Sequence, residues 1–169
     1  MTEWETIVGQ HAPQVWATAY RILGDRTDAA DCLQDTFLAA LKVTRRSEVR
    51  NWGGLLNRLA TARAVDRLRG RLRRSGREAP LPADGEMAGP GAGPPQAAED
   101  AEAADHLRRA LGRIPAGQAE AFCLRYMSDL RNQEIAQQVG MTPNAVGVLL
   151  YRARARLREL ISPSLLPET

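Results

Sequence analysis

The sequence is poor in aromatic residues, cysteine and histidine, and each shortage narrows the structures and chemistries open to it. Only 5% of its 169 residues are aromatic, although 44% are hydrophobic. A core built mainly from Leu, Ala, Val and Ile favours helices over sheets. Two cysteines and two histidines, scattered along the chain, provide no zinc-ligand spacing.

The two cysteines, Cys32 and Cys123, each lie within an apolar helical pattern. We predict two small buried side chains in a protein of a reducing compartment. The alternative is a redox pair, which requires that folding bring the two thiols into contact.

Long apolar runs and recognisable catalytic motifs are also absent. No stretch approaches the roughly 18 apolar residues of a membrane-spanning helix, and residues 1–10 lack the basic and apolar segments of a signal peptide. We therefore expect a cytoplasmic protein without membrane insertion. Because no metal cluster, nucleophile arrangement or Gly-rich phosphate loop is found, we predict no enzymatic activity and no cofactor.

Lysine is nearly absent, since Lys42 is the only one and every other basic residue is arginine. The charge is distributed unevenly: residues 1–78 carry +5, residues 79–106 carry −6 and residues 107–169 carry +4. Two basic blocks indicate two contacts with a polyanion. The alternative is a solvated surface, with the arginine bias of a GC-rich genome.

Apolar residues recur at helical spacing over most of the chain, which predicts an all-α protein of two small helical domains. The first domain, residues 1–74, is expected to contain helices at Glu3–Leu23, Thr27–Lys42 and Asn51–Arg74. Pro13 is expected to kink or split the first helix. Thr27 is the expected cap of the second helix and Asn51 that of the third. The predicted buried stripe of the second helix consists of Ala30, Leu33, Phe37 and Leu41.

Residues 75–104 contain five of the ten prolines and no apolar periodicity, so they are predicted to form a flexible acidic linker. The second domain, residues 105–169, begins where the helical pattern returns near Ala104. It is expected to end with a short helix, Arg131–Val139, and a long one, Pro143–Ile161.

The segment from Gln133 to Val146 fits a helix-turn-helix. Ala136 allows two helices to cross closely, Gly140 supplies a turn with positive φ, and Thr142 and Pro143 suit the start of the next helix. An αα-hairpin without a role in DNA binding is the alternative. The predicted buried stripe of the second helix includes Val146, Ala153, Leu157 and Leu160.

In a helix-turn-helix, the second helix enters the major groove and its first half reads bases. Asn144 suits adenine, Arg152 suits guanine or phosphate, and Gly147 and Val148 offer little hydrogen bonding. Arg156 and Arg158 face either phosphates or solvent. The complete predicted DNA-binding set comprises Thr142, Asn144, Gly147, Val148, Tyr151, Arg152 and Arg154.

A second basic site is predicted on the third helix. Arg63, Arg67, Arg71 and Arg74 recur every three or four residues, so they favour a phosphate track along one helix face. A solvated helix end before a linker is the alternative.

Three segments in order resemble the extracytoplasmic-function sigma factors of the sigma-70 family. Residues 23–42 resemble region 2.1–2.2, residues 51–69 resemble regions 2.3–2.4, and residues 114–158 resemble region 4, including the Leu124-Arg-Tyr motif. The resemblance implies a transcription initiation factor that binds core RNA polymerase and directs it to promoter DNA. Leu55 and Ala62 depart from the family pattern, which often has Trp and Asn there.

The resemblance also implies site residues and partners. The surface that docks on the β′ coiled coil of the polymerase would comprise Asp31, Gln34, Asp35, Phe37 and Leu38. Asn57 and Arg58 would join the four arginines of the third helix in binding the −10 element. The loop at residues 44–50 would help to hold a flipped base, and the linker would lie near the RNA path as a nucleic-acid mimic. Region 4 would read the −35 element and touch the β flap, and an anti-sigma factor would be a further partner.

An autonomous helix-turn-helix regulator is the alternative function. Such a regulator needs a dimer to read paired half-sites, and no dimerisation helix is evident in the sequence. It also leaves the predicted docking surface, Asp31 to Leu38, without a purpose. Tight specific binding to duplex DNA without polymerase would favour this alternative.

Overall fold

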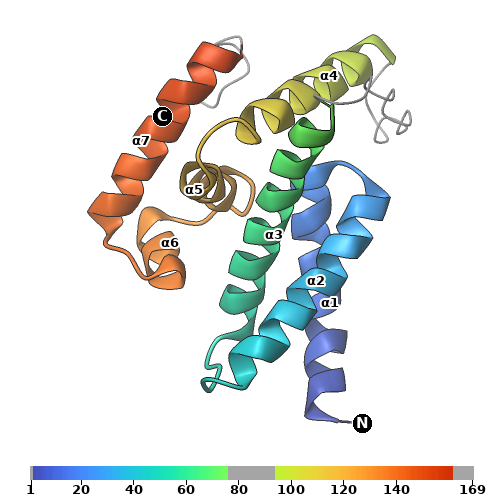
Figure 1. Cartoon of the computed structure of the whole chain (residues 1–169), viewed down its shortest axis with the longest axis vertical. Coiled ribbons are helices and arrows are strands. Elements are labelled where there is room, and N and C mark those ends of the chain that lie inside the picture. Colours follow the sequence, from blue (N-terminus) through green and yellow to red (C-terminus); the bar gives the residue numbers. More distant parts are fainter. Residues whose placement is uncertain (1, 76–93, 162–169) are drawn as a thin grey trace.

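The computed structural model describes residues 2–75 and 94–161. Within these ranges it contains seven helices and no strand, so the predicted all-α class is confirmed (Figure 1). The helices are α1 (Glu3–Leu23), α2 (Arg26–Thr44), α3 (Trp52–Ser75), α4 (Pro94–Leu111), α5 (Ala116–Tyr126), α6 (Asn132–Val139) and α7 (Pro143–Leu160).

The first three helices form a unit in which each packs against the other two. Polar side chains cap their first turns. The Thr2 hydroxyl accepts from the Glu5 amide, the Asp25 carboxylate from the Asp28 amide, and the Asn51 side chain from the Gly54 amide. The Asn51 cap was predicted, whereas α2 is capped by Asp25 and not by Thr27. The cap lies two residues before Thr27 because α2 already begins at Arg26.

The buried stripe of α2 differs from the prediction. Ala29, Cys32 and Thr36 are fully buried, while Ala30 is exposed. The apolar pattern missed Thr36 because that residue is polar. Its hydroxyl donates to the Cys32 carbonyl at 2.7 Å, so it can be buried without an unpaired group.

Two other expectations about helices are corrected. α1 continues as a single helix through Pro13 and is not split there. α4 begins at Pro94, so residues 94–104 are helical and not part of a flexible linker. Proline is tolerated in a first helical turn, and the alanine-rich run that follows has high helix propensity without an apolar stripe. The rest of the predicted linker, residues 76–93, lies outside the described residues.

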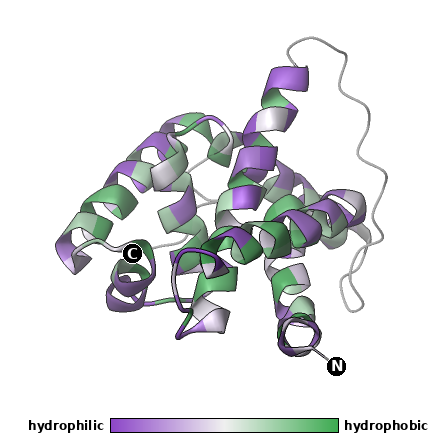
Figure 2. Cartoon of the chain, turned by 60° about the horizontal axis from the view of Figure 1, so that its bottom comes forward, coloured by the Kyte–Doolittle hydropathy of each residue, from purple (hydrophilic) through white to green (hydrophobic). Residues whose placement is uncertain are grey.

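The second unit is built around the helix-turn-helix. Its own core contains Ala121, Leu124 and Ile135 from α5 and α6, packed against Val146 and Leu150 of α7. Figure 2 shows hydrophobic and hydrophilic residues alternating along the helices, as expected for helices with one buried side. Leu160 was predicted to be buried but is 41% exposed, because α7 ends there beyond its packing partners.

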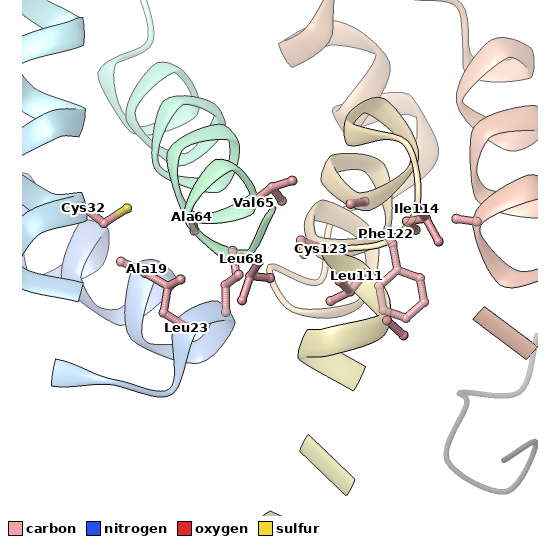
Figure 3. Packing of buried hydrophobic residues seen from close by; sticks show 14 of the residues in the cluster. Ala19, Leu23, Cys32, Ala64, Val65, Leu68, Leu111, Ile114, Phe122 and Cys123 are labelled. Atoms are coloured by element: carbon pink, nitrogen blue, oxygen red, sulfur yellow. The ribbon is translucent and has the colours of Figure 1, made fainter. Parts of the chain in front are cut away.

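The two units share a continuous apolar cluster. Leu68 and Val65 of α3 lie in the same cluster as Leu111, Ile114 and Phe122 of the second unit (Figure 3). α3 packs on α4, α5 and α6, so this helix carries most of the contact between the units (Figure 1). The two predicted domains therefore pack against each other in this structure.

Candidate nucleic-acid and polymerase interface

The turn between α6 and α7 has the geometry that the sequence predicts. Gly140 has a φ of 73°, and its amide donates to the Ala136 carbonyl at 3.0 Å. The Thr142 hydroxyl accepts from the Ala145 amide at 3.1 Å, and Pro143 occupies the first turn. These contacts fix the angle at which α7 leaves the turn.

The exposed side of α7 carries four of the predicted DNA-binding residues. Tyr151 is 69% exposed, Val148 is 47% exposed, and Asn144 and Arg152 are also exposed. Spacings of three and four residues place them on one helix face. Arg156 and Arg158 are exposed further along, so the second half of α7 presents positive charge.

The remaining predicted residues of α7 and its cap lie elsewhere. Arg154 donates to the Tyr126 hydroxyl at 2.8 Å and is drawn back onto α5. Gly147 faces α6, where a Cβ would lie 3.9 Å from the Asn132 amide nitrogen. The Thr142 hydroxyl is already used as a cap. Their geometry therefore favours roles in positioning α7.

α6 is anchored at its start by a charged pair. The Glu134 carboxylate accepts from the backbone amide and the guanidinium of Arg131, at 3.1 and 2.9 Å. These hydrogen bonds lower the pKa of Glu134. The exposed carboxylate also complements the positive end of the α6 dipole.

The outer face of α2 holds the residues predicted to dock on polymerase. Leu38 is 58% exposed, and Asp31 and Gln34 are exposed beside it. Phe37 is only 8% exposed, since its ring packs edge-on against Trp4 with ring centroids 6.0 Å apart. Phe37 therefore supports this face from inside, and Leu38 is its exposed apolar group.

An ion-pair network joins α2 to α3. The Arg67 guanidinium lies 2.9 Å from Asp35 and 3.8 Å from Asp31, and Arg71 Nε donates to Asp28 at 2.9 Å. Burial alone would lower the pKa of Arg67, but the bond to Asp35 and the three nearby carboxylates outweigh it and raise the pKa. Arg71 also donates to a main-chain carbonyl at the end of α1.

The predicted −10 residues of α3 thus occupy two faces. Arg63 and Arg74 are exposed on the side where Arg67 and Arg71 pair with α2. Asn57 and Arg58 lie toward the second unit. The Asn57 side-chain oxygen accepts from Thr18 at 3.1 Å and from Ser128 at 3.3 Å, while Arg58 and Leu55 line a cavity with α6. Sequence reasoning missed Ser128, which has no signal outside this contact.

The two cysteines are buried free thiols, as predicted. Burial raises the pKa of Cys32 to about 11 and that of Cys123 to about 12. Figure 3 shows α3 lying between them, so they do not form a redox pair. No cluster of metal-ligating side chains occurs in residues 2–75 or 94–161, and no helix there is long and apolar enough to cross a membrane.

Comparison with known families matches both units. Residues 7–74 match the family model of Sigma-70 region 2, and residues 104–157 match that of Sigma-70, region 4. The chain belongs to the sigma-70 family. The two matched regions lie in the family's order and coincide with the α1–α3 unit and the helix-turn-helix unit.

The curated relatives that the chain matches are extracytoplasmic-function (ECF) sigma factors. It is 29% identical over 165 residues to the ECF RNA polymerase sigma factor SigE of Mycolicibacterium smegmatis, a match that covers 96% of this chain and 63% of that protein. It is 39% identical over 70 residues to SigD of Mycobacterium tuberculosis, covering 41% and 33%. The chain therefore spans less than two thirds of the length of these relatives.

Two solved sigma-factor structures share the fold of this chain. The sigma factor RpoE, in complex with the anti-sigma factor NepR from Bartonella quintana, aligns with a TM-score of 0.57 and 21% identity, covering 95% of this chain and 97% of that one. CnrH, in complex with the cytosolic domain of CnrY, aligns with a TM-score of 0.54 and 26% identity, covering 93% and 86%.

Proposed function

We propose that this sigma factor binds core RNA polymerase and directs it to specific promoters, and that it is not itself an enzyme. The observation that carries the proposal is the presence of two different surfaces on one chain. Region 2 exposes an acidic and apolar face on α2, and region 4 exposes a helix-turn-helix face on α7. An autonomous DNA-binding regulator would need only the second surface.

The docking surface on polymerase comprises Leu38 and, one to two turns before it on the same face of α2, Asp31, Gln34 and Asp35. An exposed apolar side chain with a polar rim beside it suits a protein interface. The partner would be the β′ coiled coil, and a basic side chain there could compete with Arg67 for Asp31 and Asp35. Region 4 would touch the β flap in the same complex.

Promoter recognition would be divided between the two regions. The α7 face with Asn144, Val148, Tyr151 and Arg152 would enter the major groove of the −35 element. On α3, Asn57 and Arg58 would meet the −10 element from one side, and Arg63 and Arg74 would contact its phosphates from the other. The ion pairs of Arg67 and Arg71 favour a role in holding α3 against α2.

An anti-sigma factor is proposed as a further partner. The similar structures of RpoE and CnrH were solved with NepR and with the cytosolic domain of CnrY. A binding protein that covers α2 would block polymerase by occupying Leu38 and its rim. The cytoplasm is the compartment in which all of these partners would be met.

Run-off transcription tests the proposal. Core RNA polymerase is incubated with and without the full chain on a library of upstream DNA fragments, and discrete starts that need the protein are expected. Leu38→Asp, an exposed substitution, should abolish these starts by preventing core binding. Exposed Ala98→Asp on α4 is the matched control and should leave them unchanged.

Two outcomes would contradict the proposal. One is no binding of the wild-type chain to core polymerase. The other is tight, specific binding to duplex DNA in the absence of polymerase, which would favour an autonomous regulator.

A further inference from the structure

The centre of the exposed face of α7 is largely apolar. Spacings of four, three and four residues form one stripe along the outside of this helix, which we call the outer stripe: Asn144, Val148, Tyr151 and Ala155. The outer stripe lies opposite the buried positions that pack on α5 and α6. Val148 is 47% exposed and Tyr151 is 69% exposed, so both side chains are available to a partner. Within the stripe, only the Asn144 amide and the Tyr151 hydroxyl can form side-chain hydrogen bonds.

The position beside the outer stripe, on the side of α6, has no side chain. Gly147 lies there, and a Cβ at this position would meet only the Asn132 amide nitrogen, at 3.9 Å. Gly147 also lines an open cavity with Arg131 and Asn132 at the start of α6. There is therefore room for a polar side chain at Gly147, but the chain provides none. The face can form few hydrogen bonds with bases near Val148.

An apolar side chain in the major groove of DNA has one specific partner. Every base pair presents hydrogen-bond donors or acceptors in that groove, and thymine adds a methyl group. A valine held against donors and acceptors would remove water from them without replacing its hydrogen bonds, which costs free energy. Against a thymine methyl group, the same valine buries apolar surface instead. Val148 therefore favours a thymine at the position that it meets.

Asn144 adds a preference for adenine one turn earlier. Its side chain is exposed, and an asparagine amide matches the N6 and N7 atoms of adenine. Val148 lies about 6 Å further along the helix axis, at about 1.5 Å per residue. Successive base pairs are about 3.4 Å apart. The two side chains are therefore expected to meet base pairs roughly two steps apart, with Tyr151 about one step further.

The surroundings of the outer stripe favour DNA over a protein partner. Arg152 borders the stripe, and Arg156 and Arg158 are exposed further along α7. The sequence of α7 contains a single acidic residue, Glu159, in its last turn. An apolar stripe bordered by arginines suits a groove in which methyl groups lie between two rows of phosphates.

We infer that α7 reads the −35 element mainly through thymine methyl groups, with Val148 as the specificity-determining residue and Asn144 contacting an adenine about two base pairs away. The inference rests on the proposed function, since it names the bases that region 4 recognises. Arg152, Arg156 and Arg158 would add affinity through phosphates without choosing the sequence. A −35 element with A·T pairs at its centre is the consequence.

Selection from a promoter library is the first test. Core polymerase with the full chain bound is mixed with fragments that share one −10 region, taken from a start found by run-off transcription, and carry a randomised −35 region. The bound fragments are sequenced. We expect enrichment of adenine and of thymine, about two positions apart, at the centre of the −35 region. Enrichment of G·C pairs at these central positions would overturn the inference.

Replacing thymine by uracil tests the methyl contact directly, because uracil lacks the methyl group and keeps every hydrogen-bonding atom. Uracil is placed at each −35 thymine of a selected promoter in turn, and the affinity of the polymerase complex is measured. At the thymine that meets Val148 we expect a loss of about fourfold, which corresponds to burial of about one methyl group. Equal affinity for thymine and uracil at every −35 position would overturn the inference.

Val148→Ala tests the residue. On the thymine promoter this variant should bind about fourfold more weakly than wild type, and on the uracil promoter it should bind equally well, because the methyl contact is already absent there. Val148 is exposed and alanine has the higher helix propensity, so the fold should be retained. Leu160→Ala is the matched control: Leu160 is also apolar and 41% exposed, but lies at the far end of α7. This control should discriminate between thymine and uracil as wild type does, whereas the same discrimination in Val148→Ala would contradict the inference.

A second variant supplies the hydrogen-bonding group that the face lacks. Gly147→Arg places a guanidinium beside the outer stripe, where it can pair with the O6 and N7 atoms of guanine. The same selection should then yield a guanine near the thymine that Val148 meets. An unchanged selected sequence would show that this side of α7 does not face the bases, and would overturn the placement of the stripe in the groove.

The outcomes distinguish this inference from the proposed function. If the wild-type chain does not bind core polymerase, the proposed function is overturned and the inference with it. If wild type starts transcription normally but does not distinguish thymine from uracil, only the inference is overturned. If Val148→Ala weakens binding to core polymerase and leaves the discrimination intact, the outer stripe is a protein contact and the inference is again overturned.

Discussion

The arginines of region 2 and those of region 4 have the same chemistry but different surroundings. On α3, Arg67 and Arg71 are partly buried and paired with aspartates of α2. On α7, Arg152, Arg156 and Arg158 are exposed. Paired arginines hold helices together, whereas exposed ones are free to meet phosphates at little cost. The number of arginines in a helix therefore says less about DNA binding than the acids that face it.

Replacing one paired arginine of α3 and one exposed arginine of α7 should give the largest difference in stability. Arg71→Ala deletes the contacts to Asp28 and to the Leu23 carbonyl and leaves the partly buried Asp28 carboxylate with only the longer ion pair to Arg67, at 4.0 Å. We expect a loss of about 2 kcal/mol in the free energy of unfolding, below the value for a fully buried pair because both groups are partly solvated.

Arg152→Ala is the matched control and should change that free energy by less than about 0.5 kcal/mol. Urea denaturation followed by circular dichroism measures both variants. Equal losses of unfolding free energy in the two variants would show that the ion pairs of Arg71 stabilise the fold no more than an exposed arginine does.

For DNA binding we expect the opposite: the exposed arginines of α7 should contribute more than the paired arginines of α3. With core polymerase bound and a promoter fragment as ligand, Arg156→Ala should reduce the slope of log affinity against log salt concentration by about 1, because one phosphate contact is lost. Arg67→Ala should leave the slope nearly unchanged, since this arginine already has carboxylate partners. A reduced slope in Arg67→Ala would show that Arg67 contacts a DNA phosphate, as the sequence predicted.

The smallest expected effect concerns a carboxylate between the two regions. Burial raises the pKa of Glu120, and the charge of Asp66 on α3 adds to this, while Arg58 opposes it. The folded protein therefore binds the Glu120 proton more tightly than the unfolded chain, in which the carboxyl has its usual pKa. Its stability is highest below the usual pKa and declines as pH rises through the raised one.

Glu120→Gln should remove this pH dependence. Relative to wild type, its Tm should be higher near pH 7 and similar near pH 4, where the wild-type carboxyl is protonated in both states. Differential scanning calorimetry across this range measures the difference. A Tm difference that stays constant with pH would mean that Glu120 is not ionised against Asp66.

Local signals were sufficient for much of the fold. The ends of α1 and α3, the Asn51 cap and the Gly140 turn with its Thr142 cap all follow from short segments of sequence. Such features depend on hydrogen bonds within a few residues. The start of α4 was missed because its first turns have helix propensity but no apolar face, so periodicity gave no signal.

The candidate site was predictable to different degrees. The exposed face of α7 was identified from helix geometry alone, because the opposite stripe of Val146, Leu150 and Ala153 is plainly apolar. Phe37, by contrast, received two predictions: periodicity placed it in the buried stripe of the second helix, and the family resemblance placed it on the docking surface. The structure buries its ring against Trp4, a neighbour that no local pattern identifies.

The helical class and the position of the helix-turn-helix followed from the sequence alone, because caps, turns and apolar periodicity are local. The resemblance to the sigma-70 family came from three segments in the family's order. Which arginines are paired, and that region 4 covers one face of α3, became known only from the packing of the helices. Those facts depend on Asp28, Arg67, Asn57 and Ser128 meeting across long sequence distances. No local pattern encodes such contacts, because they form only when the helices pack.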